Sequence, residues 1–190
     1  FYGVNRNLFL YKEFQLSLPE IDSIQFQAID PAKGKQNRPS LVKIESQIEK
    51  ASGTLQIDHP TNKSGRKNLK IPYPVFSSRK PSFVFYDRKG KYRKKYNRTA
   101  FYYQIDPFTL TNLDNFIIDS LNLQGTLFTD NIFQPLRRPL SIRPDYSLGL
   151  DVYTPKVGEN IFLKEGKGKG RFTGRIDLSH KGFRGDGKLE

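Results

Sequence analysis

Apolar and polar residues alternate along much of the chain, a pattern typical of β-strands that bury one face. Residues 14–18 place Phe and Leu at every second position, and Pro19 follows them. The same alternation returns over residues 24–28. Because side chains of a strand point to opposite faces in turn, we predict a half-buried strand that ends at Pro19 and a second one after it.

Residues 41–49 repeat this pattern with Val and Ile on one face and Lys, Glu and Gln on the other. A helix is also compatible with this spacing, but β-branched residues favour a strand. We therefore predict a strand here, a turn at Ser52-Gly53 and a hairpin partner over 54–58. Between the first strands and this one, residues 31–40 collect Pro, Gly, Asn and basic residues, which predicts an exposed loop.

A hairpin is predicted in the middle of the chain. Residues 82–86 are aromatic and β-branched, 87–91 have turn chemistry, and 99–105 again form a strand pattern. Its tip and returning arm carry many basic residues. We expect this arm to project into solvent.

The second half of the chain predicts one short helix and more strands. Thr111 followed by Asp114 is the only clear helix start, and we expect one or two turns. Residues 121–127 form a strand pattern that runs through Gly125, and residues 146–190 alternate strand-like triplets with glycine-rich turns. Asp145, between two turn-forming residues, is expected to cap nearby amides.

Composition agrees with a β-rich protein. Phe and Tyr supply 25 of the 190 residues, Gly and Pro another 27, and no long helical pattern appears. We predict a mostly β fold of antiparallel sheets, arranged as a sandwich or an elongated β-groove with at most one short helix. We expect residues 1–190 to be one module cut from a longer chain, since they include no methionine, with a sub-boundary near 59–81.

The positive charge is concentrated in one band. Between Lys63 and Arg98 there are thirteen Lys and Arg residues against Asp87 alone, which accounts for +12 of the net charge of +13. Tyrosines interrupt the band, and Tyr side chains beside cations are typical of anion-binding surfaces. The predicted anion- or partner-binding residues are Arg88, Lys89, Lys91, Tyr92, Arg93, Lys94, Lys95, Tyr96 and Arg98.

Two other interpretations of the band stay open. Lysines along a hairpin also keep a sheet edge soluble, with the tyrosine rings covering a sheet face. Bases of a nucleic acid can stack on tyrosines while phosphates pair with the flanking cations. The charge pattern alone does not separate these alternatives.

The residue inventory predicts no enzyme, no metal and no cofactor. The chain has no cysteine, and its two histidines, His59 and His180, lie 121 positions apart. A nucleophile-and-base pattern and a metal-ligand spacing are both missing. The glycine-rich run 166–170 lacks the spacing and the following helix of a phosphate-binding loop, so we predict a hairpin loop there.

Seven short stretches lie within about the last 110 residues: 83–87, 101–108, 113–116, 121–127, 143–149, 168–172 and 178–187. Together they resemble very large, β-rich, largely uncharacterised cell-envelope proteins of Bacteroidota. The resemblance implies an exported, extracytoplasmic segment, in the periplasm or at the cell surface, with protein partners in an envelope complex. It transfers no catalytic residue. The strand-Gly-strand alternation is also similar to repeating β-groove proteins that move lipid between membranes.

Together these observations predict a non-catalytic structural or binding module of an extracytoplasmic envelope assembly. It would dock an acidic partner through the basic hairpin: a protein surface, an anionic lipid or a polysaccharide. The alternatives are a nucleic-acid-binding protein that uses the Tyr, Lys and Arg segment, and a lipid-conduit segment with a β-groove.

Overall fold

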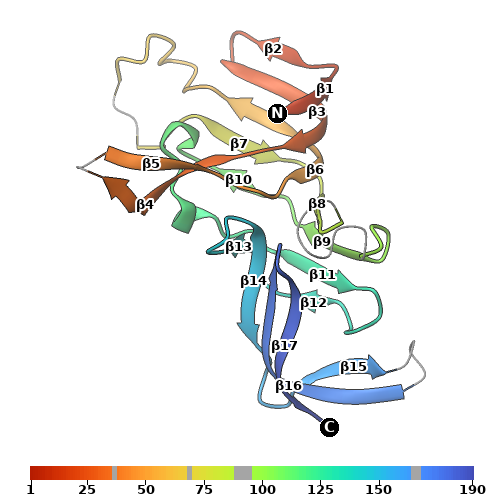
Figure 1. Cartoon of the computed structure of the whole chain (residues 1–190). Helices are drawn as coiled ribbons and strands as arrows, with labels where there is room; N and C mark the ends of the chain where they lie inside the picture. The colour runs from red at the N-terminus through yellow and green to blue at the C-terminus, as the bar shows by residue number, and fades with distance from the viewer. Residues whose placement is uncertain (36–37, 68–69, 88–95, 164–167) are drawn as a thin grey trace.

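Strands dominate the protein, and they pair in antiparallel fashion. The computed structural model describes residues 1–35, 38–67, 70–87, 96–163 and 168–190 (Figure 1). Strands make up 56% of the structure and helical turns 4%, with no helix of seven residues or more in the described part. The predicted mostly β, antiparallel fold class is therefore confirmed.

Three sheets account for the strands. In chain order these are β1 (Tyr2–Asn5), β2 (Leu8–Leu10), β3 (Gln15–Ile24), β4 (Gln27–Lys35), β5 (Arg38–Lys43), β6 (Ile48–Gln56), β7 (Val75–Ser78), β8 (Ser82–Phe85), β9 (Phe101–Ile105), β10 (Thr109–Leu110), β11 (Gly125–Thr129), β12 (Leu136–Arg137), β13 (Ser141–Ile142), β14 (Leu148–Tyr153), β15 (Glu159–Leu163), β16 (Gly168–Ser179) and β17 (Gly182–Leu189).

A ten-stranded sheet contains the predicted hairpin. Its main order is β1-β3-β6-β8-β9-β11-β12, with β2 beside β3 and β7 between β6 and β10. Strands β8 and β9 pair from Ser82 opposite Ile105 to Phe85 opposite Tyr102. This confirms the hairpin and places its connecting segment at the end of the sheet where Phe85, Tyr102 and Phe128 meet.

A five-stranded sheet forms the C-terminal part, below the large sheet in Figure 1. Its long strand β16 pairs with β15 over its first half and with β14 over its second half, while β17 follows its other edge. The predicted strand-like triplets are thus parts of longer strands. Gly174 lies inside β16 rather than in a turn. A Cβ there would lie 2.3 Å from the carbonyl oxygen of Asp186, so the glycine permits the close approach of β17.

The loop predicted over 31–40 is wrong for the described residues of this range, and positions 36 and 37 lie outside them. The structure has β4 and β5 in this region, and they pair with each other as a two-stranded sheet. Pro31 lies where the register shifts between Asp30 and Lys35. A proline, which has no N–H to donate, is tolerated at such an irregularity and on an unpaired edge, so the turn-like composition did not exclude a strand.

Two predicted strand ends are also wrong. Strand β3 continues past Pro19, because its register against β6 shifts between Leu18 and Ile21 and this bulge accommodates the proline. Strand β6 runs through the predicted turn at Ser52-Gly53. A Cβ on Gly53 would lie 2.2 Å from the carbonyl oxygen of Ser77, so this glycine permits the close approach of β7.

The predicted short helix is present as two single 3₁₀ turns, η1 (Leu113–Asn115) and η2 (Ile118–Ser120). Asn112, not Thr111, precedes the first turn, in a left-handed conformation with φ of 56°. Its side-chain amide donates to the carbonyl oxygen of Asn115. The strand predicted over 121–127 is β11, which begins at Gly125 instead of running through it.

The buried hydrophobic side chains form one cluster that extends over both large sheets. The sheets meet at phenylalanines: the ring centroid of Phe133 lies 5.8 Å from that of Phe172 and 5.9 Å from that of Phe183. The segment 59–81, where we predicted a sub-boundary, contributes β7 to the ten-stranded sheet. Whether the chain is one folding module stays a prediction.

Candidate binding surface

Seven of the nine predicted binding residues, Arg88, Lys89, Lys91, Tyr92, Arg93, Lys94 and Lys95, lie outside the described residues. Residues 88–95, here called the basic segment, hold six Lys and Arg and no acidic residue. The structure describes the residues on both sides of this segment. They show how it is attached to the sheet.

Arg98 joins the two ends of the basic segment to the sheet. Its Nε lies 2.8 Å from Oδ2 of Asp87 and its Nη2 lies 3.1 Å from Oδ1, a bidentate pair, while its Nη1 lies 2.8 Å from Oε2 of Glu49. These hydrogen bonds, first to Glu49 and then to Asp87, raise the pKa of Arg98 above its ordinary value. The charge of Arg98 is therefore engaged within the protein, which makes it an anchor of the segment.

Tyr96 is an anchor as well. Its ring stacks on Phe101 with a centroid distance of 4.2 Å and an interplanar angle of 20°. Its hydroxyl oxygen accepts a hydrogen bond from the backbone N–H of Phe183, 2.9 Å away on β17. Tyr96 thus ties the end of the basic segment to the second sheet and does not offer a free ring to a ligand.

Four aromatic rings cover the outer face of the sheet beside this anchor. Phe83 and Phe85 of β8, Tyr102 of β9 and Phe128 of β11 are all half-buried, and they alternate with fully buried neighbours on the core side. Centroid distances are 5.9 Å for Phe83–Tyr102, 6.2 Å for Phe85–Tyr102 and 4.8 Å for Tyr102–Phe128. We call these four side chains the aromatic face.

Cations lie over the aromatic face. The guanidinium carbon of Arg98 is 4.0 Å from the ring centroid of Phe85, and the ammonium of Lys50 is 5.7 Å from the same centroid. Such contacts place positive charge against the negative faces of the rings. The anchored ends of the basic segment and the aromatic face therefore form one continuous surface.

The aromatic face was only partly visible in the sequence. The strand patterns of 82–86 and 99–105 placed Phe83, Phe85 and Tyr102 on strands, but Phe128 lies just beyond the strand predicted over 121–127. The missing information was pairing: Tyr102 lies opposite both Phe85 and Phe128, which brings side chains distant in the sequence together.

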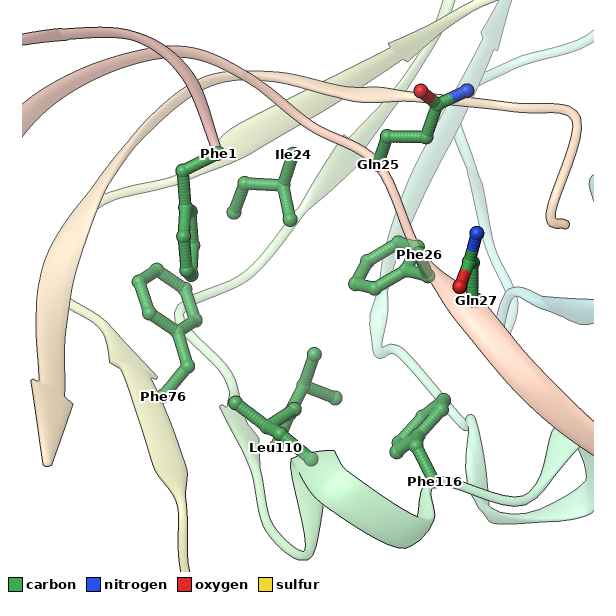
Figure 2. Close-up of a pocket in the computed structure, with 9 residues that line it drawn as sticks. Phe1, Ile24, Gln25, Phe26, Gln27, Phe76, Leu110 and Phe116 are labelled. Atoms are coloured by element: carbon green, nitrogen blue, oxygen red, sulfur yellow. The ribbon is translucent and has the colours of Figure 1, made fainter. Parts of the chain in front are cut away.

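An apolar cavity of about 160 Å³ lies at the other side of the ten-stranded sheet, near Phe1 (Figure 2). It opens between two aromatic pairs. Phe1 and Phe76 are 5.3 Å apart between centroids, and Phe26 and Phe116 are 6.4 Å apart and nearly parallel. Figure 2 shows Leu110 between the two pairs. This cavity is a second place where the protein could hold a ligand.

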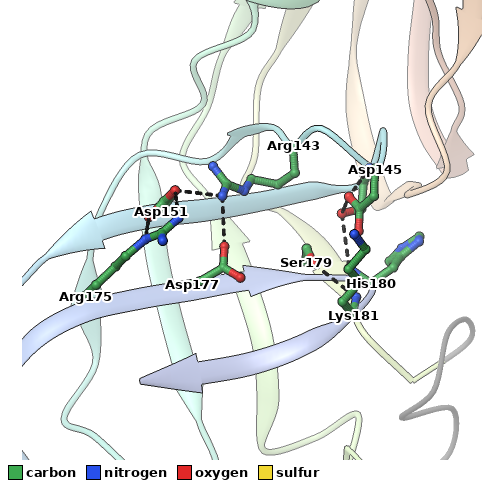
Figure 3. Close-up of polar contacts among 9 residues, drawn as sticks. Arg143, Asp145, Asp151, Arg175, Asp177, Ser179, His180 and Lys181 are labelled. Atoms are coloured by element: carbon green, nitrogen blue, oxygen red, sulfur yellow. Dashed lines mark hydrogen bonds and ion pairs between the residues drawn. The ribbon is translucent and has the colours of Figure 1, made fainter. Parts of the chain in front are cut away.

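A polar cluster connects β14 and β16 (Figure 3). Asp151 and Asp177 are cross-strand neighbours, and Arg143 Nη2 lies 2.9 Å from Oδ2 of the former and 2.8 Å from Oδ1 of the latter. Arg175 also binds Asp151, with Nε 2.6 Å from Oδ1. The Arg175 guanidinium, together with Arg143, lowers the pKa of Asp151 to about 2. Arg143 thus offsets the repulsion between the two facing carboxylates and stabilises the pairing of β14 with β16.

The histidine and serine contacts nearby are structural too. His180 Nε2 lies 3.1 Å from Oγ of Ser46, but Ser46 is only 4% exposed and its oxygen accepts a hydrogen bond from the backbone N–H of Leu148. Asp145 accepts hydrogen bonds from the N–H and hydroxyl of Ser147, which confirms its predicted capping role. The Ser46 hydroxyl is therefore enclosed by the fold and is not accessible to a substrate.

The described residues contain neither a cluster of metal-ligand side chains nor a helix that could span a membrane. No group of three or more His, Asp or Glu side chains among them is placed to hold a metal ion. None of their helical turns is long and apolar enough to cross a membrane. The prediction of a chain without catalysis stays a prediction.

The described residues define an antiparallel, mostly β protein with a half-exposed aromatic sheet face, and Arg98, near one end of the basic segment, lies against this face. Comparisons with models of protein families, with curated proteins and with solved structures found no match.

Proposed function

We propose that this chain is a non-catalytic structural or binding module that docks an acidic protein partner. The docking surface is the basic segment together with the aromatic face. One observation carries the proposal: Arg98 fixes both ends of the basic segment beside half-exposed rings, through Asp87 and Glu49. The two described ends of a segment that carries six Lys and Arg residues are thereby held next to apolar surface.

The two parts of the surface have different roles in binding. Concentrated positive charge speeds the encounter with an acidic surface and excludes basic ones. Aromatic side chains supply most of the favourable free energy at many protein interfaces, because they bury large apolar areas. An acidic protein with exposed apolar groups satisfies both parts.

An extracytoplasmic, cell-envelope setting belongs to the proposal and rests on the resemblance of the last 110 residues. Protein partners in an envelope complex fit a surface that combines charge with apolar rings. Anionic lipid and acidic polysaccharide also meet the charge requirement.

Nucleic acid is the alternative occupant of the same surface. Bases bind by stacking on free ring faces. In the aromatic face Tyr102 is already enclosed, with Phe83 and Phe85 on one side and Phe128 stacked at 4.8 Å on the other. Its ring is engaged by its neighbours, which favours a protein partner over a stacked base.

The alternative of a lipid conduit requires a continuous apolar groove. The apolar cavity in Figure 2 holds about 160 Å³ and is lined by residues of the β3–β4 connection, the β7–β10 pair, η1 and Phe1. Its size suits the end of one small apolar group, so it does not carry the conduit alternative.

The test neutralises charge in two matched places. In one variant the six bases of the basic segment become Gln; in the other the six remaining bases of the band other than Arg98, namely Lys63, Arg66, Lys67, Lys70, Arg79 and Lys80, become Gln. Both lose the same charge, and Arg98 stays. A glutamate–tyrosine copolymer is the probe, measured by fluorescence anisotropy at low and at physiological salt.

The proposal expects the first variant to lose copolymer binding and the second to keep most of it. Equal losses would mean that net charge, and not this surface, governs binding. A single-stranded oligonucleotide could instead bind more tightly than the copolymer, with a log affinity that falls steeply with log salt. That result would identify nucleic acid as the ligand of this surface. Tighter binding of the protein to phosphatidylglycerol vesicles than to the copolymer would identify anionic lipid as the ligand.

A further inference from the structure

The apolar cavity beside Phe1 is built from both ends of the β3–β4 connection and from the β7–β10 pair. Ile24, Phe76, Leu110 and Phe116 lie at its inner end and are at most 7% exposed. At about 160 Å³ it belongs to the same size class as an engineered cavity lined by Leu, Ile and Phe that stays dry and binds benzene. An apolar group of about that size fits here without a polar partner.

The cavity continues into a wider and more polar hollow of about 590 Å³. Gln25 and Gln27 line both spaces, and Tyr2 and Lys43 line the hollow. Gln27 and Lys43 are cross-strand neighbours on β4 and β5, which places the lysine beside the rim. Apolar, amide and cationic surfaces thus follow one another from the inside outward.

Lys43 has no acidic partner among the described residues, and its side chain is exposed. An unpaired cation beside an apolar opening attracts an anion. An apolar cavity that leads outward to a cation therefore favours a molecule with an apolar end and a negatively charged end. A fully polar ligand would lose its hydration in the inner cavity, and a neutral hydrocarbon would leave the cation unused.

We propose that this site binds the hydrocarbon chain of a single-chain anionic amphiphile, with the end of the chain between the two aromatic pairs and the acidic head beside Lys43. The site is separate from the docking surface, and its test does not depend on that proposal. The competing occupant is an aromatic side chain of an acidic partner protein.

Octanoate, decanoate and 1-octanol are the probes, followed by titration calorimetry. The two carboxylates are used below the concentrations at which they form micelles, and 1-octanol below its solubility limit. Decanoate should bind more tightly than octanoate, by up to about fourfold for each added methylene that the cavity buries. Octanoate should bind about threefold to fivefold more tightly than 1-octanol, the gain of one exposed ion pair. Equal affinity for the three probes would overturn the proposal.

Two variants and two controls localise the binding. Leu113→Trp places a large ring at the half-buried mouth of the cavity and should remove binding of all three probes. Leu41→Trp, at a leucine that is 62% exposed on β5, is its control. Lys43→Gln should lower octanoate affinity to that of 1-octanol and leave 1-octanol unchanged, whereas Lys12→Gln should change neither.

Nuclear Overhauser contacts give a readout that survives an unstable variant. In the unmodified chain the terminal methyl of decanoate should show contacts to the rings of Phe26 and Phe116. Contacts only to rings outside the two aromatic pairs, or decanoate binding that Leu113→Trp does not reduce, would overturn the proposal. So would an acidic phenylalanine-containing peptide that binds the cavity while decanoate does not, and that result would assign the cavity to a partner's side chain.

Discussion

At the scale of the residue, Arg98 illustrates how one side chain can organise a charged region. It binds two carboxylates that come from different places in the chain, Glu49 of β6 and Asp87 after β8. The Glu49 side chain is only 9% exposed, so its charge needs a partner. The sequence placed Arg98 among the binding residues because nothing in a charge pattern distinguishes a base that binds a ligand from one that binds the fold.

Replacing Arg98 by Gln should lower the free energy of unfolding by about 2 kcal/mol, because the nearly buried Glu49 loses a charged hydrogen-bond partner. Urea denaturation followed by circular dichroism measures the change. Arg137→Gln is the control, since Arg137 is 67% exposed where it pairs with Asp106 and should contribute at most about 0.5 kcal/mol. Similar losses in the two variants would contradict the anchoring role.

The pKa of Asp151 predicts how stability depends on acid. Its pKa is lowered to about 2 by Arg175 and Arg143, against about 3.9 for an ordinary Asp in an unfolded chain. A carboxylate with a lowered pKa stabilises the fold fully above the unfolded value, and this contribution is lost as the pH falls from about 4 towards 2. Asp151→Asn should therefore unfold with a shallower pH dependence over this range. The free energy of unfolding is measured by urea denaturation at several pH values between about 4 and 2. An Asp151→Asn variant with the same pH dependence as the unmodified chain would contradict the ion-pair geometry.

At the scale of the element, the alternation of apolar and polar residues predicted where strands lie better than where they end. The hairpin β8–β9 was predicted from aromatic and β-branched residues on both sides of a turn, whereas the strands of the last third were predicted only as short triplets between glycine-rich turns. Pro19 and Gly53 misled the prediction, because a bulge accommodates the first and the close approach of β7 requires the second. Both reasons depend on a neighbouring strand, which the local sequence does not identify.

Gly53→Ala tests that explanation. The added Cβ would meet the carbonyl oxygen of Ser77 at 2.2 Å, so β6 and β7 must separate. We expect a loss of about 1–3 kcal/mol in the free energy of unfolding, as for other overpacked sites. Hydrogen exchange should become faster at the paired amides of β7 before other strands change. A variant as stable as the unmodified chain would show that the strands are not held so closely.

At the scale of the whole molecule, two sheets share one hydrophobic cluster, and Tyr96 links them where the basic segment ends. The fold class could be predicted from composition and periodicity. The binding surface could not be fully predicted, because the aromatic face depends on which strands pair. The cavity beside Phe1 has no local signature either, since its lining comes from residues as distant as Ile24 and Phe116.

Tyr96→Phe should weaken the link between the sheets. The N–H of Phe183 loses its acceptor, which should cost about 0.5–1.5 kcal/mol, while the ring stacking on Phe101 is kept. Hydrogen exchange of the Phe183 amide should accelerate in the variant, with a smaller change at β9. Unchanged exchange at Phe183 would show that the hydroxyl does not join the sheets.

A double-mutant cycle measures whether the basic segment and the aromatic face act as one docking surface. Affinity for the glutamate–tyrosine copolymer is measured for the unmodified chain, the six-Gln variant of the basic segment, Phe85→Ala, and the two combined. One shared surface predicts a coupling free energy of about 0.5–3 kcal/mol between the changes. Tyr153→Ala, a 75% exposed tyrosine of β14, should instead be additive with the six-Gln variant. If Phe85→Ala is also additive with the six-Gln variant, the basic segment and the aromatic face do not form one docking surface.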